Sequence, residues 1–124
     1  MAGEEKQVRL SIDIGTINGI PLIILKGECD GFTAPFTHGA VGALIDAGYK
    51  RIIIDIKHLE FIDVAGFHAL DNCCIKMAEA GGEILLVNPV EKIKNIYDVL
   101  RVRESCKMLK SIDEAMARLK AHPA

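Results

Sequence analysis

The sequence predicts a single α/β domain in which helices pack against a mixed β-sheet. Residues 8–14 alternate between apolar and polar side chains, and residues 20–26 form a nearly continuous apolar run, so both segments indicate strands. From residue 33 onward, segments with helical periodicity alternate with short apolar runs. Two strands followed by alternating helices and strands are typical of a mixed sheet covered by helices. A chain of 124 residues can bury one core, so residues 1–124 are expected to form one domain.

The first two strands are expected to pair as an antiparallel hairpin. The turn between them lies within residues 15–19 and contains Asn18-Gly19, a pair that is typical of hairpin turns. Pro21 is compatible with the start of the second strand but not with its middle. The alternation in the first strand predicts its inward-facing residues, which are Val8, Leu10, Ile12 and Ile14.

A loop over residues 27–32 leads into the first predicted helix. Thr33 is suited to cap the start of this helix, and Pro35 fits its first turn. Gly48 is expected to end it. The apolar side of the helix is predicted to consist of Phe36, Ala40, Ala43, Leu44 and Ala47.

The third strand, at residues 52–56, is expected to be buried on both faces and to end at a polar break at residues 57–58. Asp63 then stands at the start of a second helix, where its carboxylate can accept a hydrogen bond from the N–H of Ala65 or Gly66. A strand that leads into a helix start presents unpaired N–H groups that attract anions. The apolar stripe of this helix is predicted to be Phe67, Leu70, Cys74, Met77 and Ala78.

The rest of the chain continues the alternation of helices and strands. Residues 81–82 end the second helix, and further strands are predicted at 83–87 and 106–109. Residues 88–89 open a third helix, and a capping box at 111–114 opens a fourth. The apolar residues expected to pack inward are Val90, Ile93, Ile96, Tyr97 and Leu100 in the third helix, and Ala115, Met116 and Leu119 in the fourth.

The composition argues against several classes of function. Charged residues make up 26 % of the chain and the net charge is −2, so the basic surface typical of nucleic-acid binding is not expected. No apolar run reaches the roughly 18 residues of a membrane span. The first six residues are polar and acidic, unlike a signal peptide. We therefore expect a cytoplasmic protein that neither inserts into a membrane nor contacts nucleic acid directly.

The sequence contains no recognisable constellation for catalysis or for metal binding. The four cysteines form no C-x-x-C pair, and we interpret Cys73 and Cys74 as small core residues rather than as a redox couple. The glycines match neither a G-x-G-x-x-G motif nor a P-loop. His68 can share an exposed helix face with Asp71 or Asn72, which we interpret as a surface contact. We expect no enzymatic activity, no cofactor and no metal site.

Three segments resemble the STAS domain of bacterial anti-sigma factor antagonists. Residues 27–30, together with Thr33-Ala34, are similar to the G-E-L-D loop of that family and the helix start after it. Residues 63–66 and 81–89 are similar to two further segments of the family. The resemblance runs from about residue 8 to residue 119, the expected core of the domain. It implies a mixed sheet flanked by about four helices and a role in partner switching.

The resemblance also implies how the protein would be regulated. Family members of this kind bind an anti-sigma factor that is also a serine kinase, and thereby release the sigma factor. The kinase switches them off by phosphorylating a serine in a D-S-S/T-G motif at the start of the second helix, which adds roughly −2 charge to the docking surface. In this sequence the acceptor position is Ala65, preceded by Val64. Alanine has no hydroxyl, so this switch cannot operate at Ala65.

We assign the partner-binding surface to the start of the second helix and the loop that resembles G-E-L-D. The assigned residues are Asp30, Thr33, Asp63, Val64, Ala65, Gly66 and His68. Besides its interpretation as a helix cap, Thr33 is kept as an alternative phosphate acceptor. The main hypothesis is a non-enzymatic regulator that binds an anti-sigma factor or kinase-type partner. The alternative is an accessory or scaffold subunit of a stress-signalling complex or a lipid-transport ATPase. A homo-oligomer and a weak nucleotide or lipid ligand are left open.

Overall fold

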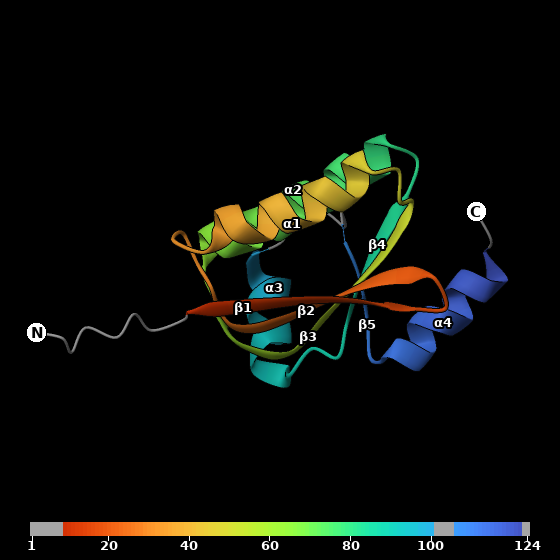
Figure 1. The fold of residues 1–124 in the computed structure, drawn as a ribbon. Coiled ribbons are helices and arrows are strands. Elements are labelled where there is room, and N and C mark those ends of the chain that lie inside the picture. Colours follow the sequence, from red (N-terminus) through yellow and green to blue (C-terminus); the bar gives the residue numbers. More distant parts are fainter. Residues whose placement is uncertain (1–8, 101–105, 123–124) are drawn as a thin grey trace, which may run out of the picture.

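The computed structural model describes residues 9–100 and 106–122, and Figure 1 shows its fold. Within this part of the chain, strands and helices follow one another in the predicted order. The elements are β1 (Leu10–Ile17), β2 (Ile20–Cys29), α1 (Ala34–Asp46), β3 (Arg51–Ile62), α2 (Val64–Glu79), β4 (Glu83–Val87), α3 (Glu91–Leu100), β5 (Lys107–Leu109) and α4 (Ile112–Ala121). Val8, which we expected in the first strand, lies outside the described residues.

The strands form one mixed sheet in the order β1-β2-β3-β4-β5. β1 and β2 are antiparallel, and the turn between them consists of Asn18 and Gly19, both of which have positive φ. The pairs β2–β3, β3–β4 and β4–β5 are parallel, and a helix connects the two strands of each pair. The predicted fold class, α/β with a mixed sheet and about four helices, is confirmed.

Helices cover both faces of the sheet, and the sheet separates the core into two clusters. Residues of α1, α2 and α3 join the larger cluster, in which the Tyr97 ring of α3 lies edge-on to the Phe67 ring of α2 at 5.0 Å between centroids. α4 packs on the other face through Ala115 and Leu119. Figure 1 shows α1 and α2 on one side of the sheet and α4 on the other. None of the helices in the described part of the chain has the length and hydrophobicity of a membrane-spanning segment.

Three strands extend further than the sequence predicts. β1 continues to Ile17, β2 to Cys29 and β3 to Ile62, whereas we expected ends at residues 14, 26 and 56. β2 and β3 remain paired past the polar residues through two irregularities of register, and finally Cys29 lies opposite Ile62. Pairing with a neighbouring strand keeps residues extended where the local sequence indicates a loop or a break. This extension matters for function because it sets where α1 and α2 begin.

The predicted apolar side of α1 is wrong in part. Phe36 is 67 % exposed, and Ala43 and Ala47 are exposed as well, whereas Leu44 is half-buried against the core. Its buried residues are instead Thr37, Val41, Gly42 and Ile45, and Gly42 lies next to Lys76 of α2. Because a close helix contact favours small residues, the largest apolar side chain did not mark the buried face.

The other helices bury most of the residues that their periodicity predicts. Phe67, Leu70, Cys74 and Met77 of α2 belong to the core, as do Ile93 and Tyr97 of α3 and Ala115 and Leu119 of α4. Outside α1, three residues that we expected to face inward are exposed. Ile14 lies on the edge strand β1, Ala78 lies in the last turn of α2, and Val90 precedes α3.

The start of α4 confirms one half of the predicted capping box. The Ser111 hydroxyl accepts a hydrogen bond from the N–H of Glu114 at 3.1 Å. The Glu114 carboxylate, in return, accepts from the N–H of Lys110 at 2.7 Å rather than from that of Ser111. The reciprocal bond is therefore displaced by one residue toward the N-terminus.

A disulfide joins α2 to the residue that precedes β5. Cys74 is bonded to Cys106, with 5.3 Å between their Cα atoms, whereas Cys29 and Cys73 are free and buried. Both Cys73 and Cys74 are core residues, as we interpreted them, but this interpretation missed the covalent bond of Cys74. The two bonded residues are 32 positions apart, and pairing over such a separation cannot be read from cysteine spacing alone.

Candidate partner-binding site

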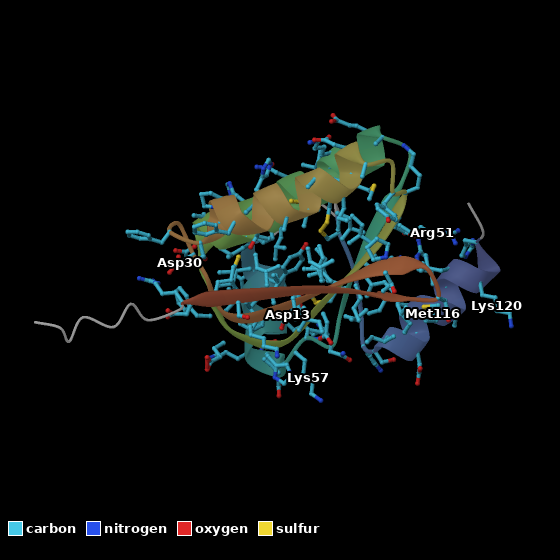
Figure 2. All side chains as sticks on the ribbon, in the orientation of Figure 1. Asp13, Asp30, Arg51, Lys57, Met116 and Lys120 are labelled. Atoms are coloured by element: carbon cyan, nitrogen blue, oxygen red, sulfur yellow. A yellow bond between two sulfur atoms is a disulfide. The ribbon has the colours of Figure 1, made fainter. Side chains whose placement is uncertain are left out.

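The parallel pairing of β2 and β3 brings the assigned residues together. Both strands end at the same edge of the sheet, and the N–H of Asp63 donates to the carbonyl of Cys29 at 3.2 Å. A Cβ atom placed on Gly31 would lie 3.6 Å from the Cβ of Ala65, so the loop after β2 touches the start of α2. Figure 2 labels Asp30 at this end of the molecule, where β2 leads into α1. We call residues 30–33, 63–66 and His68 the docking surface.

Asp63 caps α2 as predicted. Its carboxylate accepts a hydrogen bond from the N–H of Gly66 at 2.8 Å. Gly66 itself is buried against the end of β2, because a Cβ atom at this position would lie 2.0 Å from the carbonyl oxygen of Cys29. The first turn of α2 is therefore fixed by a cap on one side and by a close backbone contact on the other.

Asp30 shapes the loop between β2 and α1. Its carboxylate accepts hydrogen bonds from the N–H of Phe32 at 2.9 Å and of Thr33 at 3.1 Å, and it pairs with the Arg9 guanidinium. Burial opposes ionisation of this carboxyl, but the N–H groups of Thr33 and Phe32 and the Arg9 side chain outweigh it and lower the pKa of Asp30. With 5 % of its surface exposed, Asp30 influences a partner mainly through the shape of the loop.

We expect the Asp30→Asn variant to be less stable than the wild type near neutral pH, because asparagine keeps the size but loses the charge that pairs with Arg9. Since the folded protein lowers the pKa of Asp30, the stabilisation is complete above the unfolded pKa of about 3.9 and is lost as pH falls through the folded pKa. Urea unfolding of both proteins between pH 7 and pH 2.5 should show their difference shrinking below about pH 4. A difference that stays constant over this range would contradict the role of the charge.

Thr33 occupies the N-cap position of α1, but its side chain does not cap the helix. The hydroxyl donates to the carbonyl of Glu28 at 2.8 Å and accepts from the N–H of Asp30 at 2.9 Å. The predicted side-chain cap is therefore wrong, because the hydroxyl is used to close the loop back onto β2. Thr33 is buried, so its hydroxyl is not part of the exposed docking surface.

The exposed part of the docking surface is mostly apolar. Val64 is 54 % exposed, and Ala65 and His68 are exposed on the same helix. Sequence reasoning missed two exposed aromatic residues on the segment that follows β2, namely Phe32 in the loop, at 79 %, and Phe36 in α1, at 67 %. Phe32 follows Gly31, which touches Ala65, and the Arg9 guanidinium lies 5.6 Å from the centre of its ring. The sequence did offer a signal that Phe32 is exposed, namely its position directly after Gly31 in a predicted loop.

His68 does not form the expected surface contact with Asp71. One carboxylate oxygen of Asp71 is buried and has no hydrogen-bond partner in the described part of the chain, so Asp71 does not belong to an exposed pair. The ring of His68 instead lies 5.7 Å from the ring of Phe67, edge to face. His68 and Asn72 are exposed.

Comparison with known families gives one match that spans most of the chain. The model of the STAS domain matches residues 11–115. This range contains α1 to α3, the complete docking surface and the sheet apart from its first residue, Leu10. Arg9, which pairs with Asp30, lies outside it.

Individual relatives are distant in sequence. BtrV of Bordetella bronchiseptica, a protein provisionally named an anti-sigma factor antagonist, is 19 % identical over 90 residues, which are 73 % of this chain and 78 % of BtrV. An anti-sigma factor antagonist from Mycobacterium paratuberculosis has a solved structure with a TM-score of 0.79 at 19 % identity, covering 90 % of this chain and 94 % of that one.

The anti-sigma factor antagonist SpoIIAA in its unphosphorylated form gives a TM-score of 0.69 at 18 % identity, covering 89 % of this chain and 98 % of SpoIIAA. The structure of SpoIIAA from Bacillus has also been solved in its phosphorylated form. At such low identities, the likeness to these solved structures shows a shared fold.

Proposed function

Because the chain belongs to the STAS domain family, as its sequence resemblance predicted, we propose that it is a non-enzymatic regulator of the anti-sigma factor antagonist type. It binds an anti-sigma factor or kinase-type partner through the docking surface. The names of its relatives support this type of function, since BtrV and SpoIIAA are both named anti-sigma factor antagonists. Such a partner acts on transcription, so we place the protein in the cytoplasm.

One observation carries the proposal, namely the exposed Ala65 in the first turn of α2. Its neighbours hold it firmly at the surface, because Asp63 caps the turn and Gly66 is in close contact with β2. A rigid, exposed helix start is suited to docking against another protein. A methyl group at this position cannot accept phosphate, so the partner would remain bound under conditions that phosphorylate a serine-containing relative.

The chemistry of the exposed residues supports binding rather than catalysis. Val64, Phe32 and Phe36 offer apolar area, and large aromatic residues contribute strongly to the free energy of protein–protein binding. The side chains of residues 63–66 contain a capping carboxylate and otherwise no nucleophile, thiol or base. We therefore expect the partner to present a complementary apolar patch to this end of the molecule.

Thr33 is a poor substitute for the missing serine. Its hydroxyl is buried and takes part in two short hydrogen bonds, to Glu28 and from Asp30. A kinase would have to open the loop between β2 and α1 before it could reach this oxygen. We infer that the protein is not regulated by phosphorylation at Thr33.

The first experiment is to recover the partner with the tagged full chain and identify it by mass spectrometry. An anti-sigma factor or a related serine kinase as the main stoichiometric partner would support the proposal. Recovery of a transporter ATPase or of a large multimer without such a kinase would contradict it and would instead support an accessory or scaffold role. The Ala65→Glu variant serves as the specificity control in the same experiment.

We predict that the recovered kinase transfers no phosphate to the wild-type protein but phosphorylates the Ala65→Ser variant. Serine at this exposed helix start restores a hydroxyl, and the N–H groups of the first turn favour a phosphate there. Incubation with ATP followed by mass spectrometry of the peptide containing residues 63–66 measures the result. Phosphate on Thr33 of the wild type, or a bound but unphosphorylated Ala65→Ser variant, would show that the acceptor position has been misplaced.

A further inference from the structure

We propose that the Cys74–Cys106 disulfide is a reversible modification site, opened by a small anionic thiol that reaches it through a pocket at the other end of the molecule from the docking surface. The pocket has a volume of about 620 Å³ and is lined by both bonded cysteines. Each of these cysteines is 2 % exposed, so the pocket is the route by which a reagent can approach the sulfur atoms.

The charges around this pocket favour an anion. Lys50, Arg51, Lys94, Lys107 and His122 line it, together with the acids Glu83 and Asp98. The two acids already have basic partners, since Arg118 pairs with Glu83 at 2.5 Å and Lys94 with Asp98 at 2.9 Å.

Among the described residues, three of the lining cations have no carboxylate in salt-bridge contact. The Lys50 ammonium donates to the carbonyl of Ala80, and the Arg51 guanidinium donates to carbonyls of Leu119 and His122. Carbonyl partners orient these groups without neutralising them. Figure 2 shows Arg51 near α4, at the end of the molecule opposite Asp30. Within the described part of the chain, Lys107 beside Cys106 has no carboxylate in salt-bridge contact, so the pocket has an excess of positive charge.

The exchange reaction is balanced with two equivalents of the small thiol. The thiolate of the first attacks one sulfur of the Cys74–Cys106 bond, forms a mixed disulfide and releases the other cysteine as a thiolate. A second thiolate attacks the outer sulfur of the mixed disulfide, which releases the second cysteine and a small-molecule disulfide. The two small thiols lose two electrons and two protons, and the two cysteines take them up as thiols.

The remaining cysteines do not compete in this exchange. Burial raises the pKa of Cys29 and of Cys73 to about 11, so both stay protonated at neutral pH. Protonated thiols are poor nucleophiles, and reshuffling between Cys73 and its bonded neighbour Cys74 is therefore suppressed. The cytoplasmic location that belongs to the proposed function adds a reason for reversibility, because disulfides that form in that compartment are commonly transient or redox-sensing.

The test measures how fast the oxidised wild-type protein gains thiols at Cys74 and Cys106, by maleimide trapping and mass spectrometry. Glutathione, which is anionic, is compared with neutral 2-mercaptoethanol and cationic cysteamine at equal thiolate concentration. We expect glutathione to react fastest, and its advantage to shrink with added salt. In the Lys107→Glu variant the glutathione rate should fall roughly 3- to 10-fold, whereas Lys92→Glu, on α3 outside the pocket, should leave it unchanged.

Four reactive cysteines in the untreated, denatured protein would overturn the proposal, since this would mean that the bond does not form. Equal rates for the three thiols at all salt concentrations would exclude the basic pocket as the route, as would a Lys107→Glu variant that reacts like the wild type. The salt series needs no mutation and therefore remains decisive if a variant fails to fold. None of these measurements involves a binding partner, so they fail or succeed independently of the proposed docking function.

Discussion

The Gly66→Ala variant is expected to lose about 3 kcal/mol of unfolding free energy, because the added methyl group has no room. Its Cβ would lie 2.0 Å from the carbonyl oxygen of Cys29 and 3.1 Å from the sulfur of the same residue. A backbone carbonyl in a paired strand cannot move aside cheaply, so α2 must shift relative to β2. Thermal unfolding should show a midpoint lower by roughly 10 °C. The shift would also displace Ala65, and partner binding should weaken in parallel.

Gly39→Ala is the matched control for this prediction. Gly39 lies within α1, and a Cβ atom there meets nothing within 4 Å. Since alanine favours a helix interior more than glycine does, this variant should be about as stable as the wild type or more stable by roughly 0.5–1 kcal/mol. Equal effects of the two substitutions would contradict the close contact between α2 and β2.

Opening the disulfide should cost about 3–4 kcal/mol of stability, as expected when a cross-link over 32 residues no longer restricts the unfolded chain. We expect the oxidised wild type to unfold roughly 10 °C above the Cys106→Ser variant in the absence of reductant. Cys106 is buried, so some of this difference arises from the substitution itself.

Reductant separates these two contributions. Adding a strong reductant should lower the unfolding temperature of the wild type but leave that of Cys106→Ser unchanged. The difference between the two responses isolates the covalent bond from the packing of the side chain. A wild type that is insensitive to reductant, even after the thiols are shown to be free, would mean that the bond contributes nothing to stability.

The order and type of the elements could be predicted from the sequence because each has a strong local period. The strand ends could not, since β2 and β3 extend to Cys29 and Ile62 by pairing with each other across a separation of more than thirty residues. The buried face of α1 was misjudged for a related reason. Phe36 dominates its apolar pattern, yet Thr37 and Gly42 are buried because α1 lies close to its neighbours.

The candidate site shows the same division between local and distant information. The cap formed by Asp63 follows from its position before a helix, and the missing hydroxyl at Ala65 is visible in the sequence itself. The buried hydroxyl of Thr33 and the contact between Gly31 and Ala65 depend on how two separate segments meet. The bond between Cys74 and Cys106 likewise depends on which elements the fold brings together.

Binding by the Ala65→Glu variant tests most directly whether the partner binds over Ala65. A carboxylate at a helix start is compatible with folding, since it is favoured by the helix dipole. In a buried contact with the partner it would have to lose its hydration without a paired charge. Ala78→Glu, also exposed and on the same helix, is the matched control. Ala65→Gln separates the effect of charge from that of size.

The decisive measurement is the Kd of each folded variant for the recovered partner, by calorimetry or surface plasmon resonance. We predict that Ala65→Glu weakens binding at least about tenfold, with Ala65→Gln intermediate and Ala78→Glu like the wild type. If Ala65→Glu binds as tightly as the wild type, or if Ala78→Glu weakens binding to the same extent, the docking surface does not lie at the start of α2.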